Sequence, residues 1–192
     1  MLKRAILYVP QLTGCFAKYA DDPINIFYQE SYIDFNPKIE DNCWKIHQFV
    51  SVDSSENVIG YLNAAVSQKG HFINNLAIIR FLKNSRYNVT FSKDLAEFFE
   101  FLFLFYKYRK IDFGVSLNSP NQTWYKKYVN KYGGRIVGIL KQHFARIDGT
   151  ITDYEMYEIL LGDFCEKYQK FHPKRYQHCV EKYSLKDIKN QV

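Results

Sequence analysis

The sequence predicts an α/β protein built on one mixed, mostly antiparallel sheet, and three observations support this class. Strand-like segments separated by turn signals come first, and a long apolar helix follows them. A strand–helix–strand run and a closing strand pair come next. A strand–helix–strand run requires a parallel pairing with a right-handed crossover, so the sheet must be mixed.

The composition is that of one ordinary globular domain. The chain has 192 residues, of which 47% are hydrophobic and 24% charged, values that exclude a disordered chain. The net charge of +6 permits an anionic partner without requiring one. No apolar stretch approaches the roughly 20 residues of a membrane span, and no signal-peptide pattern opens the chain. The four cysteines are scattered, so we expect reduced thiols and a cytoplasmic protein that does not bind a membrane.

Three strand-like segments follow an irregular N-terminal part that covers residues 1–43. That part contains a short apolar run at Ala5–Val9, a turn, and a helix or strand around Ile24–Tyr32. A three-residue break containing Gly70 predicts a hairpin between the second and third segments. The segments are Trp44–Val52, Val58–Ser67 and His71–Leu82.

A long apolar helix is predicted next. It begins at Ser92, a favourable N-cap, with Asp94 in the first turn, and it runs to about Tyr108. Apolar residues form two separate stripes at helical spacing between Leu95 and Tyr108. A helix that is apolar on both sides is buried on both sides or covers a partner.

The second half of the chain predicts two further elements, a closing hairpin and a basic extension. The Gly133–Gly134 pair stops the second helix, and Asp148–Gly149 joins the last two strands. We expect a domain of residues 1–164 and a helical extension of residues 165–192, with seven cations and three carboxylates (7 − 3 = +4) after Cys165. The predicted elements are a strand Ile111–Leu117, a helix Gln122–Tyr132, and strands Arg135–Ile147 and Tyr154–Leu161.

The closing hairpin carries a family resemblance. The run from Arg135 to Leu160, with the Asn118…Tyr128…Gly133 segment before it, resembles the GNAT N-acetyltransferases. The resemblance is closest to the branch that acetylates ribosomal-protein N-termini. It implies that acetyl-CoA lies in a split between the strands His71–Leu82 and Ile111–Leu117. Its pyrophosphate would lie on backbone N–H groups at the start of the long helix.

The resemblance also implies site residues. Tyr128 is the candidate acid for the departing thiolate, although counting back from the glycine pair points to Val129, with Tyr125 close by. His71 is the candidate base, acting through water. Packing roles for both side chains stay open. Val and Phe replace two small residues of the family's phosphate loop. The candidate cofactor-binding residues are Arg86, Asn88, Val89, Thr90, Phe91, Ser92, Asn118 and Asn121.

We interpret these replacements as a GNAT-like protein that has lost efficient acetyl-CoA binding and serves as a binding or assembly module. A phage or virion component is one concrete version, because the composition favours residues of A/T-rich codons. Its partner would be a protein rather than a nucleic acid, or further copies of itself. The alternative is an active acetyl-CoA-dependent N-acetyltransferase. An open split lined by Arg86 and Tyr128 would favour the enzyme, and a split filled by Val89 or Phe91 would exclude it.

A separate cluster in the extension offers two thiols and two imidazoles. Its spacings do not match those of zinc ligand sets, so we expect no metal site there. Basic residues alternate with aromatic ones along the same extension, a pattern that serves nucleic-acid binding, docking on an acidic protein, or a solvated helix. The four residues of the cluster are Cys165, His172, His178 and Cys179.

Overall fold

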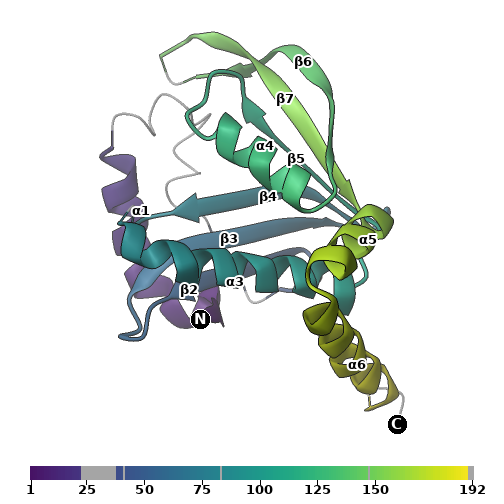
Figure 1. Ribbon diagram of the computed structural model, residues 1–192. Helices are drawn as coiled ribbons and strands as arrows, with labels where there is room; N and C mark the ends of the chain where they lie inside the picture. The colour runs from purple at the N-terminus through teal and green to yellow at the C-terminus, as the bar shows by residue number, and fades with distance from the viewer. Residues whose placement is uncertain (23–37, 41, 83, 147, 190–192) are drawn as a thin grey trace.

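The computed structural model describes residues 1–22, 38–40, 42–82, 84–146 and 148–189. Within these ranges seven strands form one sheet in the order β1-β2-β3-β4-β5-β7-β6 (Figure 1). β4 and β5 are parallel, and all other neighbours are antiparallel. The fold class and the central crossover are therefore confirmed. The strands are β1 (Leu2–Arg4), β2 (Ile46–Val52), β3 (Val58–Ser67), β4 (Phe72–Arg80), β5 (Lys110–Ser116), β6 (Arg135–Ala145) and β7 (Ile151–Leu160).

Helices cover both faces of this sheet. α3 and α4 lie on the same face (Figure 1), where apolar side chains of β3, β4 and β5 meet them in the main core. α1 packs on the opposite face of β2 and β3 in a second, smaller core. The helices are α1 (Val9–Ala20), α3 (Asn88–Glu100), α4 (Gln122–Lys131), α5 (Leu161–Phe171) and α6 (Pro173–Lys189), with short turns η1 (Ala5–Tyr8), η3 (Ser85–Tyr87) and η4 (Phe101–Phe105).

The sequence prediction missed α1. Pro10 and Gly14 read as turn signals, but Pro10 lies at the helix start, where its missing N–H costs nothing. Gly14 is on the open side of the helix, with no other group within 4 Å of a Cβ there. Leu12 and Phe16 are buried against the sheet and hold the helix in place. The helix or strand predicted around Ile24–Tyr32 lies outside the described residues.

α3 begins at Asn88, so the predicted start at Ser92 is wrong by four residues. The 3-10 turn η3 leads directly into the helix. The segment that matches the family's phosphate loop is therefore largely helical here. Val and Phe adopt helical backbone angles without strain, whereas a phosphate loop uses glycine for its unusual angles. At its other end α3 passes into the five-residue π-helical turn η4.

The second apolar side of the α3–η4 helix is covered by the C-terminal helices α5 and α6, which together form the tail. The Phe103 ring lies 4.5 Å from that of Phe164 in α5, and the Phe105 ring lies 5.4 Å from that of Tyr183 in α6. α5 begins at Leu161, so it crosses the predicted boundary at residue 164. No helix of the described chain is long and apolar enough to span a membrane.

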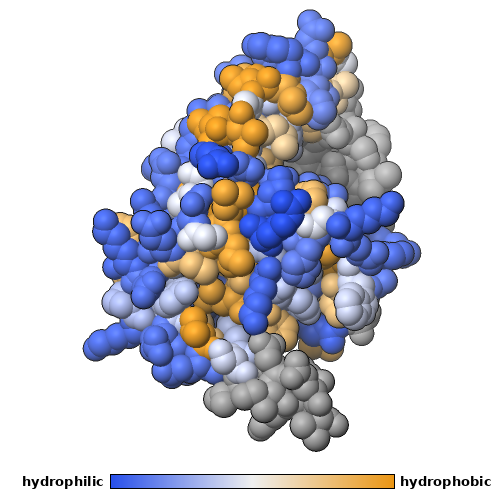
Figure 2. Space-filling model, turned by 90° about the vertical axis from the view of Figure 1, so that its right-hand side faces the viewer, coloured by the Kyte–Doolittle hydropathy of each residue, from blue (hydrophilic) through white to orange (hydrophobic). Residues whose placement is uncertain are grey.

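The strand β6 forms one edge of the sheet and exposes apolar side chains. Figure 2 shows apolar surface at the top of the molecule, where Figure 1 places β6 and β7. Unpaired edge strands offer N–H and C=O groups to another chain. A homo-oligomer stays a prediction. The exposed apolar residues of β6 are Ile136, Val137, Ile139 and Leu140.

Candidate active site at the split between the parallel strands

The strands β4 and β5 pair at one position and then separate. Ile73 pairs with Ile111 near the N-terminal ends of both strands. β4 continues to Arg80 and β5 to Ser116, without further pairing between these described strands. Their carboxyl ends therefore diverge, next to the places where α3 and α4 begin. In open sheets with parallel strands, ligands bind outside the carboxyl ends of such strands.

Tyr125 of α4 reaches across the split. Its hydroxyl is hydrogen-bonded to the backbone N–H of Ile78 in β4. Its ring lies 5.7 Å from that of Phe113 in β5. Burial raises the pKa of Tyr125 well above its ordinary value, so the phenol stays neutral. One side chain thus connects the two strands where they have separated.

Tyr128 lies one turn further along α4 and connects α4 to the start of α3. Its hydroxyl forms a hydrogen bond with the side chain of Ser92, and its ring lies 4.1 Å from that of Trp124. Burial raises the pKa of Tyr128, and the Ser92 bond and the charge of Arg80 oppose that rise. The hydroxyl therefore carries its proton at neutral pH and can donate it.

The cation at this end of β4 is Arg80, a residue that the sequence analysis did not select. Its Nη1 donates to Oδ1 of Asn88 at 2.5 Å, and its Nε donates to the carbonyl of Leu82 at 2.9 Å. These bonds hold the guanidinium beside the first residue of α3. The sequence feature that could have identified Arg80 is its position as the last residue of β4, the strand that leads into α3.

Arg86 lies elsewhere. Its guanidinium lies over the ring of Tyr87, 4.5 Å from the centroid, and donates to the hydroxyl of that residue. It also lies close enough to Asp53, between β2 and β3, to lower the pKa of that carboxyl, although hydrogen bonds from Asn57 contribute more. The structure therefore does not bring Arg86 and Tyr128 together.

Neither of the two large residues of the predicted phosphate loop is buried in the split. Val89 is 77% exposed. Phe91 is buried over β3, where a Cβ on Gly60 would meet its Cε2 at 2.2 Å. Thr90, between them, is half-buried. Neither Val89 nor Phe91 fills the split, so the condition that would exclude the enzyme is not met.

The start of α3 offers fewer free amides than a phosphate loop. The N–H of Tyr87 donates to the carbonyl of Asn84 at 3.1 Å, and that of Asn88 donates to the carbonyl of Ser85. The amides of Ser92 and Lys93 lie inside the helix, where an amide pairs with the carbonyl four residues earlier. An anion at this helix would therefore rely on the amides of its first turn after Asn88.

The remaining predicted residues lie at the two ends of the strands. His71 is in the turn before β4, with a φ of +49° and its ring 5.1 Å from that of Tyr108. About 27 Å of strand separates His71 from the open end, so it is not brought to Tyr128. Asn118 and Asn121 are exposed in the turn between β5 and α4. Asn118 has a φ of +66°, and the Asn121 carbonyl accepts from the N–H of Tyr125 at 2.9 Å.

A buried carboxylate holds α4 against β7. Glu155 is 4% exposed and accepts from Gln122 Nε2 at 3.1 Å, from Lys126 Nζ at 3.2 Å and from the Tyr157 hydroxyl. Burial alone would raise the pKa of Glu155, but these donors outweigh it and hold the pKa below its ordinary value. With its oxygens occupied, Glu155 positions α4 rather than acting as a base.

The thiols of the extension have separate partners. Cys179 lies beside Glu100, and Cys165 lies beside Tyr176. Throughout the described residues, no group of three or more His, Cys, Asp or Glu side chains could hold a metal ion.

Comparison with known proteins supports the fold and extends over most of the chain. No family model and no curated protein matches the sequence. A GCN5-related N-acetyltransferase from Brucella melitensis is 16% identical, with a TM-score of 0.65 over 92% of this chain and 80% of that chain. A variant of the spermidine N-acetyltransferase SpeG from Vibrio cholerae is 20% identical, with a TM-score of 0.60 over 85% and 96%. The chain has the fold of the GNAT acetyltransferases.

Proposed function

We propose that this protein is an acetyl-CoA-dependent N-acetyltransferase. The observation that carries the proposal is the place of Tyr128, a neutral phenol held by Ser92 at the end of the split where β4 and β5 diverge. Of the two residues whose bulk argued against an enzyme, Val89 is exposed and Phe91 packs over β3. Structures with this fold that are named as acetyltransferases support the same activity.

The chain's own groups suit that chemistry. Acetyl-CoA, when bound, supplies an acetyl thioester. An amine nitrogen forms the new bond to the carbonyl carbon, and the carbon–sulfur bond breaks. Tyr128 would donate its proton to the departing sulfur and regain one from water, and the new amide nitrogen would lose its proton to water. Arg80, beside the first residue of α3, provides a cation for the phosphates.

The acceptor that we propose is the N-terminal amine of a protein. The closing hairpin resembles the branch that acetylates ribosomal-protein N-termini. The net charge of +6 disfavours a polycationic acceptor such as spermidine, the substrate named for SpeG. Spermidine is therefore the comparison substrate in an acceptor assay.

A binding module without catalysis is the second candidate. The hydrogen bond between Tyr125 and the Ile78 N–H favours it, because that amide is engaged inside the split. The paired amides of Tyr87 and Asn88 favour it as well. The partner in that case would be a protein, since no nucleic-acid-binding motif accompanies the basic extension.

Thermal unfolding with and without millimolar acetyl-CoA separates the two candidates. A ligand at a hundred times its dissociation constant adds about 2.7 kcal/mol to the free energy of unfolding, which raises the midpoint by several degrees. Release of free thiol is then measured with peptides that carry a free or a blocked N-terminus. A raised midpoint with thiol release from the free peptide alone supports the enzyme. An unchanged midpoint and no thiol release contradict it and favour the binding module.

A further inference from the structure

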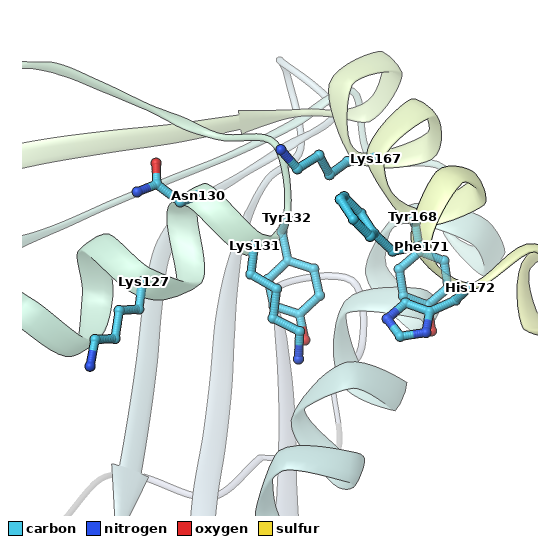
Figure 3. Close-up of a pocket in the computed structure, with 8 residues that line it drawn as sticks. All are labelled: Lys127, Asn130, Lys131, Tyr132, Lys167, Tyr168, Phe171 and His172. Carbon is cyan, nitrogen blue, oxygen red and sulfur yellow. The ribbon is translucent and has the colours of Figure 1, made fainter.

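A pocket of about 500 Å³ lies between α4 and α5, away from the split. Figure 3 shows it bounded by the end of α4 on one side and by α5 on the other. α4 begins at the carboxyl end of β5, and the pocket lies beside the last turns of the helix, where Lys127 and Lys131 line it while the Tyr128 hydroxyl bonds to Ser92 in α3. The lining residues are Lys127, Asn130, Lys131, Tyr132, Lys167, Tyr168, Phe171 and His172.

The charged side chains that line this pocket are all positive. Lys127, Lys131 and Lys167 line it, and no carboxylate does. Among the described residues none of these lysines forms an ion pair, unlike their neighbour Lys126, which binds Glu155. Three unpaired ammonium groups around one concave surface repel each other and attract an anion.

The walls and the floor of the pocket are aromatic. Phe171 is 60% exposed at the rim, with Nζ of Lys167 5.6 Å from its ring centroid. Tyr132 forms the floor, with Nζ of Lys131 5.2 Å from its ring centroid. Each cation is thus held beside an aromatic face, an arrangement that suits a ligand with both a planar ring and a negative charge.

Tyr132 is a buried residue of the pocket lining. Tyr132 is 1% exposed, and its hydroxyl oxygen is buried without a hydrogen-bond partner among the described residues. Buried hydroxyl groups in proteins normally have a partner. Burial raises the pKa of Tyr132 above its ordinary value, so the group is a neutral donor.

We propose that this pocket binds a small aromatic phosphate of the nucleoside monophosphate type, at a site separate from the acetyl-CoA site. A phosphate monoester carries about −1.5 to −2 charges, which matches three unpaired lysines better than a single carboxylate does. The volume fits a small organic ligand rather than an inorganic ion. The exposed ring of Phe171 provides a face for the base, and Lys131 and Lys167 hold the phosphate between the two helices.

Isothermal titration calorimetry with AMP tests the proposal on the full-length protein. We expect saturable binding of AMP, and binding at least tenfold weaker for adenosine and for inorganic phosphate. Lys131→Ala and Lys167→Ala should each reduce the affinity for AMP about tenfold, because each removes a charge-assisted contact with the phosphate. Phe171→Ala reduces it as well, because the stacking face is lost. Lys174→Ala, an exposed lysine outside the pocket, is the matched control and leaves the affinity unchanged.

Three results would overturn the proposal. The first is the absence of saturable AMP binding by the wild-type protein. The second is equal affinity in the wild type and in the two lysine variants, with melting temperatures that show all three to be folded. The third is competitive displacement of AMP by acetyl-CoA, which would make the pocket the nucleotide end of the coenzyme site. Additive heats from the two ligands support two separate sites.

Discussion

The two ends of the α3–α4 pair differ in the contacts that hold the helices in place. The open end is the end at the split, where α3 and α4 begin. There Val89, Ser92 and Asn121 are exposed, and the Tyr128–Ser92 hydrogen bond connects the two helices. At the closed end, where α4 finishes, the ring of Tyr132 lies 4.5 Å from that of Phe99 in α3 and 5.9 Å from that of Phe164 in α5. At this closed end the tail completes the packing around these aromatic rings.

A buried ion pair fixes the closed end. Glu100 is 2% exposed and accepts from Arg175 Nη2 at 3.0 Å, with further bonds from Arg175 Nε and the Tyr168 hydroxyl. Every one of these donors belongs to the tail. The comparison indicates that buried contacts with the tail stabilise the closed end, beside the lysine-lined pocket, whereas the open end keeps side chains available at the split. The predictions below test this division.

The largest expected effect is on catalysis at the open end. Under the proposed function, Tyr128→Phe removes the proton donor and lowers kcat about 100-fold or more, the usual contribution of a general acid. The ring and its contact with Trp124 are retained, so the free energy of unfolding falls by only about 1 kcal/mol for the lost Ser92 bond. Steady-state thiol release and urea unfolding measure the two effects. An unchanged kcat would mean that another group protonates the sulfur.

At the closed end, Glu100→Gln changes stability rather than chemistry. The variant leaves the Arg175 guanidinium without its counter-ion beside a buried amide. Arg175 is 39% exposed, so the expected loss is about 3 kcal/mol, the lower end of the range for a broken buried pair. Urea unfolding measures it. Glu97→Gln, an exposed carboxylate on the same helix, is the control and changes stability by less than about 0.5 kcal/mol. Equal losses of unfolding free energy in the Glu100 and Glu97 variants would contradict the conclusion that the buried ion pair stabilises the closed end.

Most of the fold could be predicted from the sequence because its signals are local. Hairpin turns, alternating strands and the glycine stop after α4 are each read within about ten residues. The parallel pairing followed from the crossover alone and is confirmed at Ile73 and Ile111. The helix α1 was missed because Pro10 and Gly14 read as turn signals, whereas packing of Leu12 and Phe16 on β2 and β3 holds the helix in place. Such long-range packing leaves no local signal.

The candidate site was harder to predict, since its residues depend on where side chains point. The positions of Arg86 and Phe91 on the far side of the helix start follow from a helix that begins four residues early. That shift changes which side of the helix each residue faces. Arg80 acts through bonds to Leu82 and Asn88 between β4 and α3, and Tyr125 acts through a bond to the backbone of Ile78, which is distant in sequence. No spacing rule identifies them without the fold.

Acidification should weaken the contact between α4 and β7. The pKa of Glu155 lies below its ordinary value of 4.5, so this carboxylate contributes stability above that value and loses its contribution as the pH falls through the folded pKa. Glu155→Gln is expected to cost about 2 kcal/mol at pH 7, because three donors lose a charged acceptor. The difference from the wild type should shrink as the pH falls below 4.5 in unfolding experiments. A difference that is constant with pH would show that the bonds do not depend on charge.

The smallest expected effect is also the most informative about the split. Tyr125→Phe removes the hydroxyl that engages the Ile78 N–H and is expected to cost about 1 kcal/mol of stability, since the ring contacts with β5 are kept. If that amide must be free for the acetyl group, the variant binds acetyl-CoA more tightly than the wild type. Tyr157→Phe, whose hydroxyl bonds to Glu155 instead, is the control and leaves the affinity unchanged. Weaker binding by Tyr125→Phe would instead make Tyr125 part of the binding surface. In that case the open end would be built for its ligand by the same kind of buried polar contact that closes the other end.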